Sequence, residues 1–85
     1  GTSSIAQKEI ARRARLVTQA DEALMLGRAA YAKQDYEEAV KQYRIVVSLL
    51  PPGPALEDRR RSYIGHLGDA SVELAKKFRR VGKYE

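Results

Sequence analysis

The stretch LGRAAYAKQDYEEAVKQYRIVVSLLP, residues 26–51, contains the clearest helix signals of the chain. Its apolar residues recur at intervals of three and four, which is helical spacing rather than the alternation typical of a strand. Asp35 stands three residues before Glu38, as in a capped helix start with acids near its positive end. The stretch therefore predicts one helix that ends near residue 33 and a second, antiparallel helix over 36–49.

Upstream of this stretch, the sequence predicts that the first helix begins near Ser4. Ser4 and Gln7 match a capping box, in which each side chain satisfies an unpaired backbone N–H group at a helix start. An apolar stripe at helical spacing follows, formed by Ile10, Ala14, Val17, Ala20 and Leu24. The first helix is therefore expected over 4–33.

Downstream, the segment PPGP, residues 51–54, breaks the chain before a third helix. Pro54 is expected as the first residue of that helix, where its missing N–H costs nothing. The helix is expected over 55–81, with Gly82 as its C-cap. Its apolar stripe contains Leu56, Tyr63, Leu67, Ala70, Leu74, Phe78 and Val81. With 85 residues and no strand signal, the sequence predicts a single all-α domain of three helices.

Composition excludes several classes of protein. Apolar residues make up 44% of the chain and charged residues 32%. This apolar fraction is too high for a disordered protein. The absence of cysteine excludes disulfides and thiolate metal sites. No apolar run approaches the roughly 20 residues that span a bilayer, and the N-terminus has no signal-peptide core. We therefore expect no transmembrane segment, and the compartment, cytoplasmic or periplasmic, stays unknown at the level of sequence.

Residues 20–53 resemble a tetratricopeptide repeat, a 34-residue helix–turn–helix unit. The matching positions are Leu26, Gly27, Ala30, Tyr36, Ala39, Tyr43 and Pro51. The sequence departs from the family pattern at Ala23, Gln34 and Val46, where Trp, Gly and a small residue are usual. The resemblance implies a helical hairpin in which Gly27, Ala30 and Ala39 are buried where the two helices cross.

The segment ELAKKFRRVGKYE, residues 73–85, resembles the start of a second unit. That unit would cover about 68–85, truncated before its own second helix, with an insertion before it. The resemblance implies a helix extension over 1–19, a repeat over 20–53 and a long third helix over 54–85, as a fragment of an α-solenoid. The parts of the first and third helices that precede their units, residues 1–19 and about 54–67, are expected to project from the same end. The pattern is similar to the repeat-bearing N-terminal regions of some bacterial outer-membrane secretins.

The family binds partners on the concave surface formed by the first helices of its units. By resemblance, the first unit would contribute Leu24, Arg28 and Tyr31 to this surface, and the second Val72, Lys76 and Arg79. The Lys and Asn pair that clamps a C-terminal carboxylate in chaperone-binding members is not matched, so chaperone-tail binding has no support. The resemblance implies an interaction or scaffold module that binds a protein or peptide, with basic residues attracting acids.

Two other functions are open at this stage. A net charge of +5 and three basic clusters, at residues 12–15, 59–61 and 76–80, suit a nucleic acid or an anionic lipid surface. They also suit solvated helix faces and helix caps, and the tyrosines fall mostly on packing positions, which argues against nucleic acid. The third function is structural oligomerisation, as a symmetric dimer, through apolar strips formed by Ile5, Ile10, Leu74, Phe78 and Tyr84.

The sequence offers little for catalysis. His66 is the single histidine, and a lone histidine on a helix is more often a surface or interfacial residue than a catalytic one. No metal-spaced cluster of histidines or acids and no glycine-rich phosphate loop is present in the sequence. We therefore predict a protein that is not an enzyme, with no catalytic residue, no metal site and no cofactor.

Overall fold

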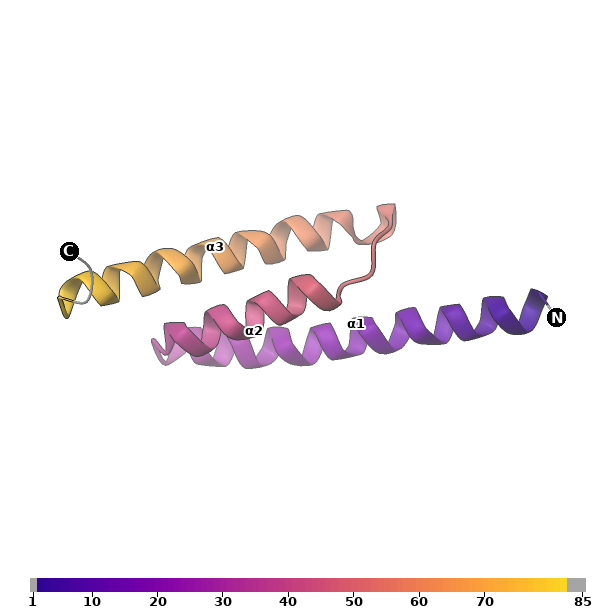
Figure 1. The fold of residues 1–85 in the computed structure, drawn as a ribbon, viewed down its shortest axis with the longest axis horizontal. Helices are drawn as coiled ribbons and strands as arrows, with labels where there is room; N and C mark the ends of the chain where they lie inside the picture. The colour runs from indigo at the N-terminus through magenta and orange to yellow at the C-terminus, as the bar shows by residue number, and fades with distance from the viewer. Residues whose placement is uncertain (1, 83–85) are drawn as a thin grey trace.

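The computed structural model describes residues 2–82, which form three α-helices and one short 3-10 turn (Figure 1). α1 spans Thr2–Ala32, α2 spans Tyr36–Leu49, the turn η1 spans Pro54–Leu56 and α3 spans Glu57–Arg80. No strand occurs in this part of the chain, which confirms the predicted all-α class. α2 runs antiparallel to both long helices and packs against each of them.

Two predicted helix starts need correction. Ser4 lies inside α1, which begins at Thr2, so Ser4 is not the N-cap of a capping box. Serine is tolerated in the first turn of a helix as well as at its cap, so the pattern does not fix the first residue. Pro54 begins η1 rather than α3, because the chain enters α3 through one tight turn in which the Leu56 N–H donates to the Gly53 carbonyl at 3.1 Å.

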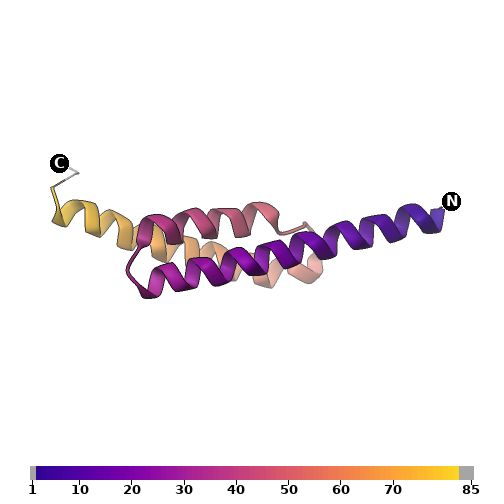
Figure 2. The same ribbon diagram turned by 90° about the horizontal axis from the view of Figure 1, so that it is seen from below.

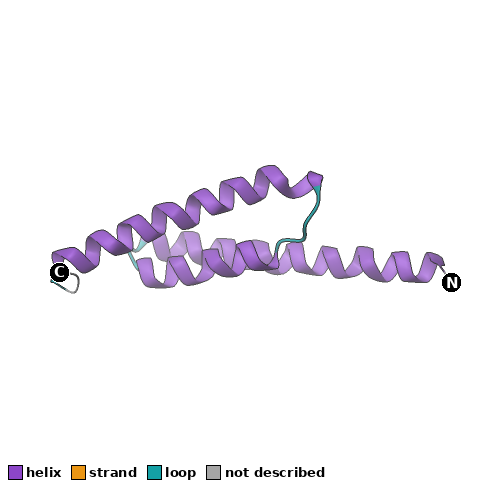
Figure 3. Ribbon diagram, turned by 45° about the horizontal axis from the view of Figure 1, so that its top comes forward, coloured by secondary structure: helices purple, strands orange, loops and turns teal. Residues whose placement is uncertain are grey.

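A tight turn connects α1 to α2, as the loop segments of Figure 3 show. The Gln34 N–H donates to the Tyr31 carbonyl and the Asp35 N–H to the Ala30 carbonyl, each at 2.9 Å. This is the Schellman pattern, which satisfies the last carbonyls of a helix. The Asp35 side chain then accepts a hydrogen bond from the Glu38 N–H at 3.3 Å, which confirms Asp35 as the N-cap of α2.

Gln34 holds this turn in a left-handed backbone conformation, with a φ of 64°. That conformation costs a residue with a Cβ about 1–2 kcal/mol and costs glycine little. We expect Gln34→Gly to raise the free energy of unfolding by about 0.5–1 kcal/mol, the gain in the folded turn being partly offset by the greater freedom of glycine in the unfolded chain. Urea denaturation followed by circular dichroism measures the change. Gln34→Ala is the control, and an equal gain from it would show that backbone strain is not the cause.

Arginines from two helices hold the connection between α2 and α3. Arg60 on α3 donates hydrogen bonds to the carbonyls of Leu50, at 2.8 Å, and Pro51, at 3.0 Å. Arg13 on α1 donates to the carbonyl of Pro52 at 2.7 Å. Arg60 also donates to the carbonyl of Val47 at 3.4 Å, in the last turn of α2, where carbonyls lack partners within the helix. Arg60 therefore caps α2, and Arg13 holds the segment that follows it.

The core contains two clusters, and all three helices contribute to each. One consists of Ala20, Ala23, Val46, Leu50 and Tyr63. The other consists of Ala30, Ala39, Val40, Tyr43 and Ala70. At Gly27, which is buried, a Cβ would lie 2.6 Å from a ring carbon of Tyr43, so glycine is required for the two helices to approach this closely. The prediction that Gly27, Ala30 and Ala39 are buried is confirmed.

The molecule is elongated, with extents of 60 × 20 × 18 Å along its three principal axes. Its helices are offset from one another along the longest axis. The N-terminal part of α1 projects past one end and the C-terminal part of α3 past the other (Figures 1 and 2). Residues 3–12, named the α1 arm here, are all exposed. The extensions that precede the two expected units, at the start of α1 and at the start of α3, lie at the same end of α2, as expected, because both long helices run antiparallel to it (Figure 1).

Candidate partner-binding groove

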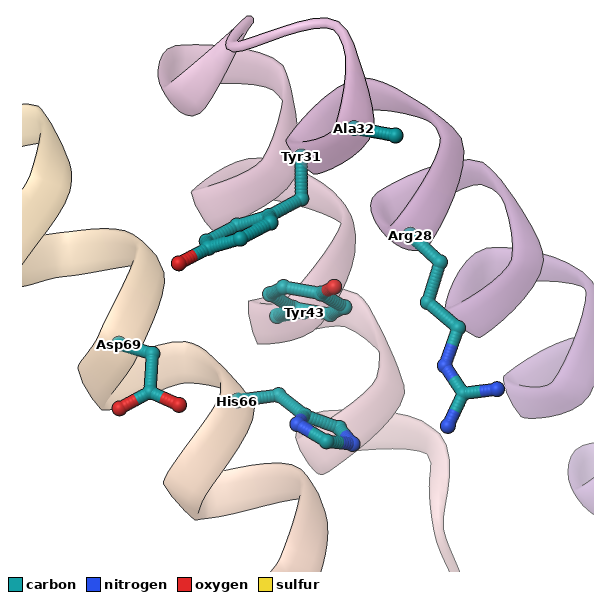
Figure 4. A pocket seen from close by; sticks show the side chains of 6 residues that line it. All are labelled: Arg28, Tyr31, Ala32, Tyr43, His66 and Asp69. Atoms are coloured by element: carbon teal, nitrogen blue, oxygen red, sulfur yellow. The ribbon is translucent and has the colours of Figure 1, made fainter.

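A groove between α1 and α3 contains a cavity of about 250 Å³. Its lining comes from all three helices and consists of Arg28, Tyr31, Ala32, Tyr43, His66 and Asp69. Figure 4 shows Arg28 on the α1 side, Asp69 on the α3 side and the ring of Tyr43 between them. The groove is thus a concave surface with an aromatic base and charged sides.

Tyr43 forms the floor of the groove and is 4% exposed. Its ring centroid lies 5.7 Å from that of His66, and the His66 ring lies 6.3 Å from that of Tyr63. Burial raises the pKa of the Tyr43 hydroxyl; Arg28 opposes this rise, and Tyr31 and Asp69 add to it. The phenol therefore stays neutral at physiological pH, and the floor is a packed aromatic surface without charge.

The two sides of the groove carry opposite charges. Arg28 on α1 and Asp69 on α3 are both exposed, and neither forms an ion pair with another residue of the described range 2–82. Tyr31 projects from α1 toward α3 in Figure 4. Its pKa is raised first by burial and then by the charge of Glu73, with further contributions from Tyr36 and Asp69. The α3 side is therefore negative, whereas the α1 side is positive.

Two turns before Arg28, α1 and α3 are joined directly. Arg59 on α3 forms an ion pair with Asp21 on α1, with 2.5 Å between Nη2 and Oδ1. Arg59 also donates a hydrogen bond to the Tyr63 hydroxyl at 3.0 Å, and its guanidinium lies 5.6 Å from the centre of the Tyr63 ring. These contacts, with the packing of Tyr63 and Ala70 in the core, accompany the position of α3 along α1.

The structure brings together some of the residues predicted to bind a partner. Arg28 and Tyr31 line the groove. Leu24 is half-buried and packs against both core clusters, outside the groove lining. The other predicted residues, Val72, Lys76 and Arg79, are exposed but do not line the groove. Their role in binding stays a prediction.

The reason for this difference is the position of α3 along α1. Asp21 and Arg59, which touch, are separated by 38 residues in sequence. The repeat resemblance aligned the unit expected over 68–85 with the repeat over 20–53, which is a wider separation, and so placed the second half of α3 beside Arg28. In the structure, His66 and Asp69 occupy that place. Sequence reasoning missed both, although their spacing of three, which puts two residues on one helix face, was available as a signal.

Most residues of the basic clusters bind groups of the same chain. Besides Arg13, Arg59 and Arg60, three more form ion pairs with acids three positions earlier along the same helix. They are Arg12 with Glu9 at 2.8 Å, Arg61 with Asp58, and Lys76 with Glu73 at 3.4 Å. The clusters therefore act in part as helix caps and intrahelical pairs, which was one of the two readings of the sequence.

The residues predicted to form an oligomer interface lie at opposite ends of the molecule. Ile5 and Ile10, in the α1 arm, are 71% and 67% exposed. Leu74 and Phe78 are half-buried beside Glu37 at the start of α2, so the exposed strip expected from them is reduced. Tyr84 lies outside the described residues. Self-association through these side chains stays a prediction.

The described residues contain no group of three His, Cys, Asp or Glu side chains placed to hold a metal ion. Among the same residues, no helix combines the length and the apolarity needed to cross a membrane. The chain was compared with protein-family models, with curated proteins and with solved structures, and none of the three comparisons found a match.

Proposed function

We propose that this chain is a non-enzymatic protein-interaction module, and that it holds a helical or extended segment of a partner in the groove between α1 and α3. The observation that carries the proposal is the groove itself: a buried aromatic floor, Tyr43, flanked by Arg28 and Asp69, which have no ion-pair partner within residues 2–82. Concave sites with an apolar base and a few placed charges are typical of recognition surfaces.

We further propose that the module is of the tetratricopeptide type. In support, the small residues Gly27, Ala30 and Ala39 are buried between antiparallel helices, and Pro51 closes the hairpin. α3 then packs against α2, as the first helix of a following unit would. Such units bury their apolar faces against neighbours, and the surface between successive first helices is available for binding. The similarity to secretin N-terminal regions and the cellular compartment stay predictions.

Two observations bear on the alternative functions. Ion pairs and backbone hydrogen bonds already engage much of the basic clusters, which weakens the case for a nucleic-acid or lipid surface. Structural oligomerisation is favoured by the exposed Ile5 and Ile10 of the α1 arm. The groove favours a partner segment over both, because it places unpaired charges of both signs beside the half-buried ring of Tyr31.

The test uses short displayed peptides selected on the immobilised protein. Peptides that are enriched are labelled, and their affinity is measured by fluorescence anisotropy. We expect Arg28→Glu to weaken binding about tenfold or more, corresponding to at least ~1.4 kcal/mol. Arg44→Glu makes the same charge change at an exposed residue of α2 outside the groove lining and should leave the affinity unchanged.

Two results would contradict the proposal. One is a selection that enriches no peptide. The other is a set of enriched peptides that bind the Arg28→Glu variant as tightly as the original protein. Circular dichroism of each variant confirms that helix content is retained, so that a loss of affinity reports on the groove and not on unfolding.

A further inference from the structure

The charges that α1 and α3 present to each other alternate in sign along the helices. At the first position along the two helices, Asp21 of α1 forms an ion pair with Arg59 of α3, at 2.5 Å. Two turns farther along α1, the positive Arg28 stands on one side of the groove and the negative Asp69 on the other. Each helix thus changes sign between the two positions.

The second pair of charges is held apart. Arg28 and Asp69 line the same cavity of about 250 Å³, with the ring of Tyr43 between them, and do not form an ion pair with each other (Figure 4). Glu73, one turn beyond Asp69, raises the pKa of Tyr31 but is paired with Lys76 at 3.4 Å, so Asp69 supplies the unpaired negative charge of this side. The groove therefore presents a positive wall and a negative wall across an aromatic floor.

We infer that the partner segment carries charges of both signs, with an acidic side chain against Arg28 and a basic side chain against Asp69. This inference rests on the proposed function and identifies the class of partner that the groove recognises. A segment with only acids would face like charge from Asp69 on the α3 wall, and like-charge juxtaposition suppresses binding. The two walls also fix the orientation of the segment, because reversing it across the groove would bring like charges together.

The inference differs from what the sequence predicts for this surface. Lys76 and Arg79 were expected on the α3 side, which would make both walls basic and suit a purely acidic partner. Neither residue lines the groove, and Lys76 is paired with Glu73 at 3.4 Å. The position of α3 beside α1 therefore makes the α3 wall acidic where the sequence predicts a basic one.

The experiment examines individual charges on peptides enriched by selection on the original protein. In each peptide, one acidic and one basic residue are replaced by alanine, separately, and each peptide is measured against the original protein, Arg28→Ala and Asp69→Asn. We expect the acidic residue to matter severalfold for the original protein and Asp69→Asn but not for Arg28→Ala. The basic residue should matter for the original protein and Arg28→Ala but not for Asp69→Asn. Such double-mutant cycles isolate pairwise coupling.

The outcomes separate this inference from the proposed function. Enriched peptides that carry only acids, and that bind Asp69→Asn more tightly, would overturn the inference and leave a groove for acidic segments. Peptides with both signs that show no coupling to Arg28 and Asp69 would also overturn it. A selection without enrichment would overturn the proposed function and the inference together. Both substituted residues are exposed, so the variants are expected to fold, and circular dichroism verifies this.

Discussion

Replacing Tyr43 with alanine is expected to lower the free energy of unfolding by about 3–5 kcal/mol, as truncation of a large buried aromatic side chain does. Tyr43 is 4% exposed and packs in a cluster with Ala30, Ala39 and Ala70, so its ring joins α2 to both long helices. A domain of this size has a total stability of roughly 4–13 kcal/mol, so the loss takes a large share of it. Urea denaturation followed by circular dichroism measures it.

Tyr43→Phe is the matched control. It keeps the ring and removes the hydroxyl, so we expect its free energy of unfolding to stay within about 1 kcal/mol of the original. A loss below about 1.5 kcal/mol for Tyr43→Ala would contradict the central place of the ring in the packing. A large loss for Tyr43→Phe would instead show that the hydroxyl holds the three helices together through a hydrogen bond.

Adding one methyl group at Gly27 is expected to destabilise the protein, whereas adding it at Gly65 stabilises it. A Cβ at Gly27 would lie 2.6 and 2.8 Å from two ring carbons of Tyr43, whereas a Cβ at Gly65 meets no atom within 4 Å. Overpacking of this kind costs about 1–3 kcal/mol, and alanine in an exposed helix gains about 0.5–1 kcal/mol over glycine. Gly27→Ala should therefore lower the melting temperature and Gly65→Ala raise it.

Thermal unfolding of the two variants, measured beside the original protein, gives the direction in which each melting temperature changes. For a domain of this length, each 1 kcal/mol corresponds to roughly 4–8 °C in melting temperature. Because both variants make the same chemical change in a helix, the difference between them reports on packing alone. Melting temperatures that shift in the same direction would show that α1 and α2 are farther apart at Gly27 than they are in the structure.

The helices could be predicted from the sequence because their signals act over a few residues. Asp35 caps α2 through a group three residues away, and Pro51 limits the helix that precedes it. The burial of Gly27 and Ala39 was implied by the resemblance of this hairpin to a tetratricopeptide repeat. Each of these features depends on neighbours in the same helix or hairpin, so no knowledge of the third helix was needed.

The position of α3 could not be predicted in the same way. It depends on the connection before α3, where Gly53 adopts a φ of 140° and η1 adds a tight turn. It depends also on the contact between Asp21 and Arg59, which lie far apart in sequence. The groove combines residues from both long helices, so an error in this position changes its composition. That is why Arg28 and Tyr31 were identified from sequence and Asp69 was not.

The main helix contacts join helices that are neighbours in the sequence, and this has a consequence for how fast the chain folds. α2 packs against the helix before it and the helix after it, and both connections are short. Closing short loops costs little entropy, and helical proteins dominated by such local contacts fold within microseconds to milliseconds. The exposed α1 arm takes no part in these steps. Docking of adjacent helices, rather than a search between distant parts of the chain, therefore sets the folding rate.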